Sequence, residues 1–491
     1  MFDIEIAGYL LNSNISKYTI EYLSEEYLHF SIEEYLRALG VNEEKDEQLN
    51  LFVEQQETID LKPYVYCYAI NKLYNILNAK LEEVGSKELF ESIEMPLVEV
   101  LADMQYEGIY IEKEELISFG NTLKEKIEEL TNEIYNVAGE NFNINSTKQL
   151  GEVLFEKLGL PAIKKTKTGY STDVDVLEKL KEKHVIIEKL LEYRQLVKLN
   201  STYVEGLLPY INKNTNRIHS SFHQTATSTG RISSTDPNLQ NIPTRFELGK
   251  NLRKVFKAEK DNIFIDADYS QIELRILAHI SEDKNMIDAF INDEDIHAMA
   301  AAKVLNKSIE EVTKDERTHA KAINFGIVYG ISDFGLSEQL GISRKKAKEY
   351  IEQYLEKYSG IKKFMDDIVE DAKEKGYVET LYKRRRYIPE LKSNNYMVRQ
   401  FGARAAMNTP IQGTAADIMK IAMINVYKKL KEENLKSKLI LQVHDELLIE
   451  TEKNEEEKVK KILINEMENV IKLKVPLKAD LSEGKNWLEA K

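Results

Sequence analysis

The chain has 491 residues, a hydrophobic content of 42 % and a single cysteine, Cys67. This length predicts more than one domain, the lone cysteine excludes an internal disulfide, and no apolar run reaches the roughly 18 residues of a membrane-spanning helix. We therefore expect a cytoplasmic protein that does not cross a membrane. The net charge of −15 argues against a nucleic-acid partner, but residues 1–60 contain 14 acidic and three basic residues and so carry −11 of it.

The first 94 residues are acidic, rich in tyrosine and typical of helices, and they contain no complete set of catalytic residues. Asp3 and Glu5 have the D-x-E spacing of a metal site. No apolar strand precedes them and no further carboxylate is suitably placed, so we expect this pair to be inactive. Elsewhere, basic residues gather at 164–167, 245–257 and 383–386, and each cluster alone favours a solvated surface.

Two long amphipathic helices are predicted between residues 116 and 208. Apolar residues recur from Leu116 to Val137 at spacings of three and four, which indicates a helix with a coiled-coil-like face. A segment with helical spacing lies between Val185 and Leu208, so the two should form an antiparallel arm. Between them we expect a helix capped at Ser146 and a lysine-rich tip at 160–172. The tip could contact a phosphate backbone or be a plain surface loop.

The stretch from 261 to 277 contains the first candidate catalytic residue. Residues 262–265 predict a short buried strand that ends on Asp266 and Asp268, and helical spacing follows from Tyr269. A carboxylate at a strand end can present oxygen ligands to Mg²⁺. From this stretch alone, however, helix N-cap is the favoured role for Asp268. A metal site therefore requires a second carboxylate from elsewhere.

A mostly helical region follows, from residue 281 to about 395. Within it, Arg317, Lys321 and Phe325 are spaced at i, i+4 and i+8 and so share one helix face, with Tyr329 continuing the row. Two cations beside an aromatic ring can bind a polyphosphate while the ring packs on a base or sugar. The alternative is an exposed helix whose face is purely structural, and these residues alone leave both interpretations open.

Near the C-terminus, apolar runs flank His444, Asp445 and Glu446, which predicts a buried hairpin with this triplet at its turn. Adjacent carboxylates inside an apolar element are costly unless they are solvated, paired or bound to metal. Asp445 is therefore the second carboxylate that a metal site at Asp268 requires.

Three motifs, in this order, resemble the polymerase motifs of family A DNA polymerases: D-Y-S-Q-I-E-L-R, R-x-x-x-K-x-x-x-x-F-G-x-x-Y-G and V-H-D-E. The likeness covers about residues 90–491 and includes T-G-R-I-S-S-T-D-P-N-L-Q-N-I-P and G-A-R-A-A-M-N-T-P-I-Q-G-T-A-A-D-I. It implies a mixed α/β right-hand polymerase fold preceded by a helical remnant of a 3′–5′ exonuclease-like domain. The implied regions are the truncated, inactive exonuclease-like region (1–94), the thumb (95–200), the first part of the palm (201–281), the fingers (282–395) and the second part of the palm (396–491).

The resemblance also implies a chemistry, in which dNTPs extend a primer 3′-hydroxyl and pyrophosphate is released. Asp268, Asp445 and the Tyr269 carbonyl would bind two Mg²⁺ ions, for which Mn²⁺ could substitute, with Glu446 in support. Lys321 would protonate the leaving group. The implied dNTP-binding residues are Arg317, Lys321, Phe325, Tyr329, His297, Gln271 and Glu273. Among these, Arg317 and His297 match residues that grip the outer phosphates, and Glu273 matches the family's steric gate against a ribose 2′-hydroxyl.

The same resemblance implies a set of DNA-binding residues: Arg231, Asn238, Gln240, Arg245, Arg404, Asn408, Gln412 and His444. Minor-groove acceptors occur on all four bases, so donors such as Arg and Gln can check the shape of a base pair without reading its sequence. The implied partners are primer–template DNA and dNTPs. We expect a monomer with roles in DNA repair and replication, through gap filling and primer replacement.

The likeness weakens at the N-terminus. Residues 2–13 resemble an internal segment of the family's exonuclease domain, so the half with the first two metal carboxylates is missing. Asp3 would be a surviving third carboxylate, and the expected Y-x-x-x-D is Tyr64 followed by Tyr68. We therefore expect no proofreading, in either a fragment or a naturally shortened enzyme.

Three alternatives compete with a DNA polymerase. A single-subunit RNA polymerase shares the palm, but Glu273 argues against it. A catalytically silent DNA-binding remnant is disfavoured because Asp268, Asp445, Arg317 and Lys321 are all retained. A nuclease using the same two metals would need the N-terminal carboxylates, whose set is incomplete.

Overall fold

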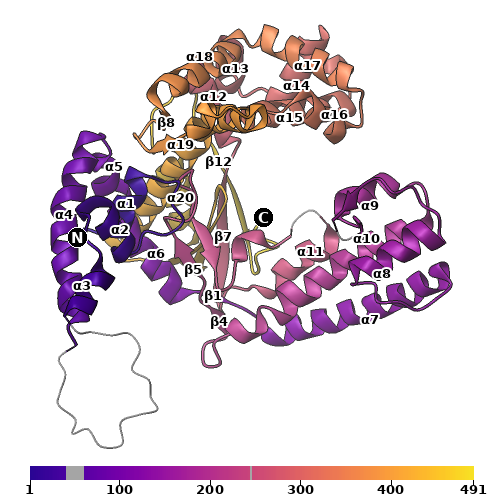
Figure 1. The fold of residues 1–491 in the computed structure, drawn as a ribbon, viewed down its shortest axis with the longest axis horizontal. Coiled ribbons are helices and arrows are strands. Elements are labelled where there is room, and N and C mark those ends of the chain that lie inside the picture. The colour runs from indigo at the N-terminus through magenta and orange to yellow at the C-terminus, as the bar shows by residue number, and fades with distance from the viewer. Residues whose placement is uncertain (40–59, 168, 244–245) are drawn as a thin grey trace, which may run out of the picture. The chain divides into compact units, whose positions relative to one another are not determined.

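The computed structural model of the chain describes residues 1–39, 60–167, 169–243 and 246–491 (Figure 1). The chain forms two compact units. The first unit comprises Met1–Tyr106, Phe222–Ser234 and Ile265–Ser482, and the second comprises Glu107–Ser221, Thr235–Phe264 and Glu483–Lys491. None of the described helices has the length and apolar character needed to cross a membrane.

The N-terminal part of the first unit is helical, as its sequence predicts. Its elements are α1 (Ile4–Leu11), α2 (Ile20–Leu28), α3 (Ile32–Ala38), α4 (Lys62–Glu83), α5 (Lys87–Leu89), the π-helical turn η1 (Phe90–Glu94) and α6 (Met95–Glu107). The carboxylate of Asp3 caps α1, since it accepts hydrogen bonds from the amides of Glu5 (2.8 Å) and Ile6 (2.9 Å). This cap explains Asp3 without a metal, while the expected lack of proofreading stays a prediction.

A four-stranded sheet belongs mainly to the first unit. Its order is β10 (Lys438–Val443), β11 (Glu446–Glu452), β7 (Asn262–Tyr269) and β12 (Ala479–Gly484). β10 and β11 are antiparallel, with Val443 opposite Glu446. α19 (Tyr396–Glu432) packs on β10, and α20 (Glu456–Glu468) packs on β11. β7, β10 and β11 are mostly buried, and they contain the apolar runs that the sequence shows around 264 and 440.

The region from residue 272 to 392 is mostly helical, in agreement with the sequence. Its elements are α12 (Ile272–Ser281), α13 (Lys284–Ile291), α14 (Ile296–Leu305), η7 (Ile309–Glu311), α15 (Lys314–Val328), α16 (Asp333–Leu340), α17 (Arg344–Lys357), α18 (Ser359–Lys375), β8 (Tyr377–Glu379), β9 (Arg385–Tyr387) and η8 (Pro389–Lys392). α14 packs against both α15 and α17.

The second unit contains the predicted antiparallel arm, formed by α7 (Lys113–Ala138) with α10 (Val185–Lys198) and η3 (Leu199–Glu205). Glu133 of α7 pairs with Lys189 of α10 at 2.6 Å, whereas Gly120 lies against Val204 of η3, so the two segments run in opposite directions. A Cβ on Gly120 would lie only 2.7 Å from Val204 Cγ1. The missing side chain thus permits the close approach.

The remaining elements of the second unit are short. They are β1 (Ile109–Tyr110), α8 (Thr147–Gly151), η2 (Glu152–Lys157), β2 (Lys165–Thr166), β3 (Gly169–Tyr170), α9 (Val174–Leu180), η4 (Leu208–Tyr210), β4 (Arg217–Ile218), η5 (Leu239–Asn241), α11 (Glu247–Leu252) and η6 (Arg253–Val255). Ser146 caps α8, as predicted, by accepting from the Gln149 amide. In the lysine-rich tip, Lys164 pairs with Asp173 at 3.0 Å.

Two basic clusters that were expected to be solvated each contain a buried arginine. Arg253 is 4 % exposed, and its guanidinium lies 4.2 Å from the centroid of the Trp487 ring. Arg384 is 2 % exposed and donates to Asp417 from Nε (2.9 Å) and Nη2 (2.6 Å). The expectation is wrong at these two positions because the partners come from distant parts of the chain, which a local charge pattern does not reveal.

Arg384 belongs to a buried charge network, which consists of Glu94, Arg384, Asp417 and Lys420. Glu94 accepts hydrogen bonds from Arg384 and from Lys420 Nζ, the latter at 2.6 Å. Burial alone would raise the pKa of Glu94, but the charges of Lys420 and Arg384 outweigh it and lower the pKa to about 2. The network joins η1, α19 and the turn between β8 and β9 with two positive and two negative charges, so its formal charge is zero.

We expect the substitution Glu94→Gln to lower the free energy of unfolding by about 3–5 kcal/mol, because it leaves an uncompensated buried positive charge. Glu91→Gln removes the same charge from an exposed position three residues earlier, and its effect should stay within about 0.5 kcal/mol. Urea denaturation of both variants checks this. Equal effects would contradict the assigned role of Glu94.

Candidate active site

Asp266 and Asp268 both lie within β7, not at its end. The strand extends to Tyr269, and α12 starts at Ile272 with Gln271 as its N-cap residue, in a left-handed conformation (φ 56°) and without a side-chain cap bond. The strand is thus longer than the sequence predicted. A tertiary hydrogen bond holds its last residue, since the Tyr269 hydroxyl donates to the Met467 carbonyl at 2.7 Å. The alternative that Asp268 serves as the helix N-cap is therefore wrong.

The second carboxylate lies in the turn of the β10–β11 hairpin. This turn consists of His444, which is left-handed (φ 54°), and Asp445. Glu446 was expected in the turn but is instead the first residue of β11 and is 2 % exposed. The Tyr269 amide donates to the Asp445 carbonyl at 3.0 Å. This bond joins the end of β7 to the turn and so brings the Asp268 and Asp445 positions together.

A cavity of about 310 Å³ opens beside this junction, a size within the usual range for small-molecule sites. Seven predicted site residues contribute to its lining, together with Ile272, which the sequence analysis did not identify. The seven are Arg231, Gln271, Glu273, Phe325, Tyr329, His444 and Asp445. These residues come from four segments that are far apart in the sequence, and the fold brings the segments together around one cavity.

Glu273 is held by donors from two distant segments. Arg231 Nη2 lies 2.5 Å from its Oε1, and the Tyr329 hydroxyl donates to its Oε2 at 3.0 Å. The carboxylate is buried, at 6 % exposure. Burial and the neighbouring Glu273 charge raise the pKa of Tyr329, so this hydroxyl remains a donor at neutral pH. Glu273 is thus fixed in place at the cavity wall.

The cationic row on α15 is present, but it lies outside the cavity lining. Lys321 is exposed, and Arg317 is partly exposed with its Nε 2.6 Å from Asp295 Oδ2. Phe325 belongs to the lining. Tyr329 was expected to continue the helix but is its C-cap residue, because α15 ends at Val328.

His297, for which the resemblance implies a role in gripping the outer phosphates, is buried and neutral. It is 3 % exposed, its ring centroid lies 5.8 Å from that of Phe325, and its Nδ1 is 2.9 Å from Asn324 Nδ2. Burial, together with the charges of Arg317 and Lys321, lowers its pKa to about 4. The sequence analysis did not identify Asn324 as a partner of His297. The only indication in the sequence is that this polar residue stands between the apolar residues Ile323 and Phe325.

The predicted DNA-binding residues fall into separate groups. Arg404, Asn408 and Gln412 are spaced at i, i+4 and i+8 on α19 and so share one of its faces. Asn238 and Gln240 lie in the second unit, where the Asn238 side chain accepts from the Gln240 amide at 3.0 Å. Arg245 lies outside the described residues.

The donor set at the β7–hairpin junction fits Mg²⁺. Within the described ranges, no group of three or more His, Cys, Asp or Glu side chains could hold a metal by itself. Two carboxylates are nevertheless what Mg²⁺ usually takes from a protein when substrate phosphates and water supply the other ligands. Asp268 and Asp445, with main-chain carbonyls near them, meet that requirement.

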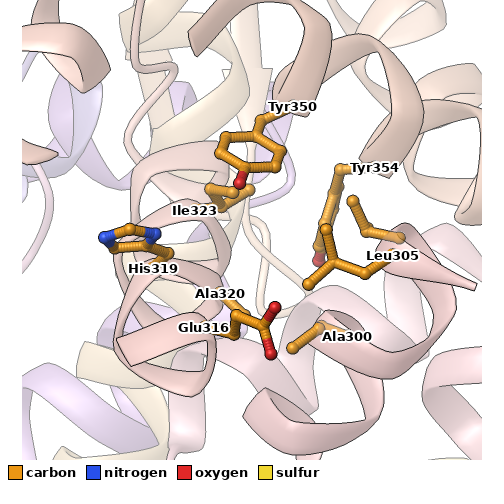
Figure 2. Close-up of a pocket in the computed structure, with 10 residues that line it drawn as sticks. Ala300, Leu305, Glu316, His319, Ala320, Ile323, Tyr350 and Tyr354 are labelled. Atoms are coloured by element: carbon orange, nitrogen blue, oxygen red, sulfur yellow. The ribbon is translucent and has the colours of Figure 1, made fainter. Parts of the chain in front are cut away.

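A second cavity, lined by residues of α14, α15 and α17, is too small for a substrate (Figure 2). Its volume of about 20 Å³ has room for one water molecule. Most of its lining is apolar, including Ala300, Leu305 and Ile323. We therefore assign it no catalytic function.

The model of DNA polymerase family A matches residues 113–489. The chain belongs to this family. DNA polymerase I of Caldicellulosiruptor bescii and that of Bacillus subtilis are each 49 % identical to it, over 489 and 493 residues, which is 100 % of this chain and 55 % of each relative. The family A chain thus spans about half the length of these relatives.

A solved structure of the POL domain of Pol1 from M. smegmatis, in complex with DNA primer-template and dNTP, is similar to the family A chain. The two share 38 % sequence identity with a TM-score of 0.90, over 99 % of this chain and 82 % of the other. The mixed α/β right-hand polymerase fold predicted from the sequence is confirmed. The domain boundaries and the roles of individual site residues stay predictions.

A neutral buried His297 predicts a pH dependence of stability. Its pKa is lower in the folded state than the usual 6.5, so the unfolded chain takes up the proton first as the pH falls. The stabilisation is complete above about pH 6.5 and is lost toward pH 4. We therefore expect His297→Gln to show a smaller fall in melting temperature between pH 7 and pH 5 than the wild type.

The matched control for this measurement is His29→Gln, because His29 is exposed. This variant should follow the wild-type pH dependence. If His297→Gln also follows it, the ring is not held neutral by the fold.

Proposed function

We propose that the chain is a DNA-directed DNA polymerase, which extends a primer 3′-hydroxyl with dNTPs as a template directs and releases pyrophosphate. The observation that carries this proposal is the junction of β7 with the β10–β11 turn, which brings the Asp268 and Asp445 positions together beside the 310 Å³ cavity. Membership of family A supports it, as does the similarity to the Pol1 domain that was solved with DNA primer-template and dNTP.

Asp268, Asp445 and the Tyr269 carbonyl would hold two Mg²⁺ ions, with Mn²⁺ as a substitute. When bound, such ions lower the pKa of an attacking hydroxyl and neutralise charge on the leaving group. The chain's own contribution is to hold Asp268 in β7 and Asp445 in the adjoining turn of the β10–β11 hairpin, so that little reorganisation is needed during the reaction. Glu446, buried at the start of β11, would support the turn.

Residues of α14 and α15 would bind the triphosphate. Lys321 is exposed and would donate a proton to the departing pyrophosphate. Arg317 would bind an outer phosphate oxygen by exchanging its contact with Asp295 for one with the nucleotide. His297 would contribute as a neutral hydrogen-bond donor, since burial disfavours its charged form.

Glu273 would select the sugar. Because Arg231 and Tyr329 both bind its carboxylate, it cannot move away readily when a ribose 2′-hydroxyl approaches. Phe325 and Tyr329 would pack beside the incoming nucleotide and the templating position. Gln271, which also belongs to the cavity lining, would complete the nucleotide site.

Primer–template DNA would be bound by residues that check the minor groove without reading sequence. These are Arg231, Asn238, Gln240, Arg245, Arg404, Asn408, Gln412 and His444. We propose a monomeric enzyme of the cytoplasm, without proofreading, that acts in gap filling and primer replacement.

We expect Asp445→Asn to reduce template-directed primer extension at least about 10³-fold, because the substitution removes one of two charges that the transition state requires. The control is Asp480→Asn, which makes the same change at an exposed residue of β12 and should leave extension within about twofold. Extension of a labelled primer with Mg²⁺ and dNTPs measures both. If the wild type bound DNA but did not extend the primer, the proposal would fail, and the chain would be a catalytically silent DNA-binding remnant.

We also expect Glu273→Ala to lower the preference for dNTP over rNTP about 10²-fold or more, because the carboxylate no longer obstructs the 2′-hydroxyl. The isosteric variant Glu273→Gln should retain most of this preference. The ratio of kcat/KM for dCTP and CTP measures it. Equal selectivity of Glu273→Ala and wild type would show that the gate lies elsewhere.

A further inference from the structure

The loop from Gln224 to Arg231, here called the 224–231 loop, leads to the active-site contact between Arg231 and Glu273. It connects β5 (Ser221–His223) and β6 (Ser233–Thr235). Within the loop, the Thr227 hydroxyl donates to the Arg231 carbonyl at 2.9 Å. The position of Thr227 is therefore coupled to that of Arg231.

Tyr9 of α1 binds this loop directly. Its hydroxyl donates to the Thr227 carbonyl at 2.8 Å, and its side chain is fully buried. The donor comes from the N-terminal region, far from Thr227 in sequence. This region, for which we predict no catalytic activity, thus contacts the loop that carries Arg231.

Glu94 binds the start of the same loop. Gln224 Nε2 donates to Glu94 Oε2 at 2.6 Å and to the Glu94 carbonyl at 3.0 Å. Lys420 and Arg384 in turn hold the Glu94 carboxylate. A buried carboxylate is retained only where such partners compensate its desolvation, so the buried charge network fixes one end of the loop.

Arg384 supports the other end of the loop, next to Arg231. Gly230 has a φ of +88°, and a Cβ at this position would lie 2.6 Å from Arg384 Nε. The backbone of Gly230 therefore packs directly against the guanidinium. Asp417 fixes that guanidinium through two hydrogen bonds.

We propose that Tyr9 and Glu94, with Arg384, are positioning residues for Arg231, so that the N-terminal region is a structural support of the active site. They act through the 224–231 loop and touch no substrate. The proposal rests on the proposed function, because its kinetic consequence requires that Arg231 and Glu273 act on primer and nucleotide. It also explains why two buried polar side chains of the N-terminal region are directed at this loop.

The test compares Tyr9→Phe with Tyr18→Phe. The Tyr18 hydroxyl also donates to a main-chain carbonyl, that of Asn12, at 2.8 Å, and Tyr18 is 4 % exposed. Both variants therefore lose a buried hydroxyl that donates to a main-chain carbonyl in the same region, but the Tyr9 hydroxyl binds the 224–231 loop and also interacts with Arg384. Thermal melting and circular dichroism establish that both are folded.

Hydrogen–deuterium exchange of a peptide spanning 224–234 gives a measurement that is independent of catalysis. Exchange should be faster in Tyr9→Phe and unchanged in Tyr18→Phe. Primer extension should then show a kcat/KM for dNTP about 3- to 10-fold lower in Tyr9→Phe, the effect of about one hydrogen bond, and within about twofold of wild type in Tyr18→Phe. In an Arg231→Ala background, Tyr9→Phe should have no additional effect.

Equal exchange in the two tyrosine variants would overturn the proposal, whether or not the protein extends primers. Faster exchange in Tyr9→Phe with an unchanged kcat/KM would overturn the positioning role. Absence of extension in the wild type would instead refute the proposed function, and the exchange data would still decide whether Tyr9 holds the loop.

Discussion

The hydrogen bond from the Tyr269 amide to the Asp445 carbonyl is the interaction on which the candidate active site depends. It fixes the end of β7 beside a two-residue turn, so the Asp268 and Asp445 positions lie near each other although one precedes and the other follows the long helical region. A backbone bond suits this purpose because it does not depend on a flexible side chain. The main chain thus holds the strand and the turn that carry the two carboxylates.

Two buried carboxylates near the site are each held by side chains from distant segments of the sequence, which compensate the cost of burying the charge. Glu273 is held by Arg231 and Tyr329, and Glu94 is held by Arg384 and Lys420. Each carboxylate would be costly to bury alone. Arg231 and Arg384 are connected through the 224–231 loop, because Gly230, the neighbour of Arg231 in the chain, packs on Arg384. The stability of the buried charge network and the geometry of the cavity wall are thereby linked.

Local patterns in the sequence predicted features that local physics determines. The three- and four-residue spacing from Leu116 predicted α7, and Ser146 was identified as a cap. The role of Asp268 could not be derived from its neighbours, because bonds from Tyr269 to Asp445 and Met467 extend β7 past the expected helix start. For the same reason the cluster that contains Arg384 was assigned to a solvated surface. Each of these errors involves a partner that is remote in sequence.

We propose that Asp268 and Asp445 together hold two divalent ions beside the cavity. Electron paramagnetic resonance of Mn²⁺, titrated into the protein with primer–template DNA and a non-hydrolysable dNTP analogue, tests it most directly. We expect two Mn²⁺ ions bound per chain in the wild type and in Asp480→Asn, and fewer than two in Asp445→Asn. The same stoichiometry and affinity in Asp445→Asn as in the wild type would contradict it.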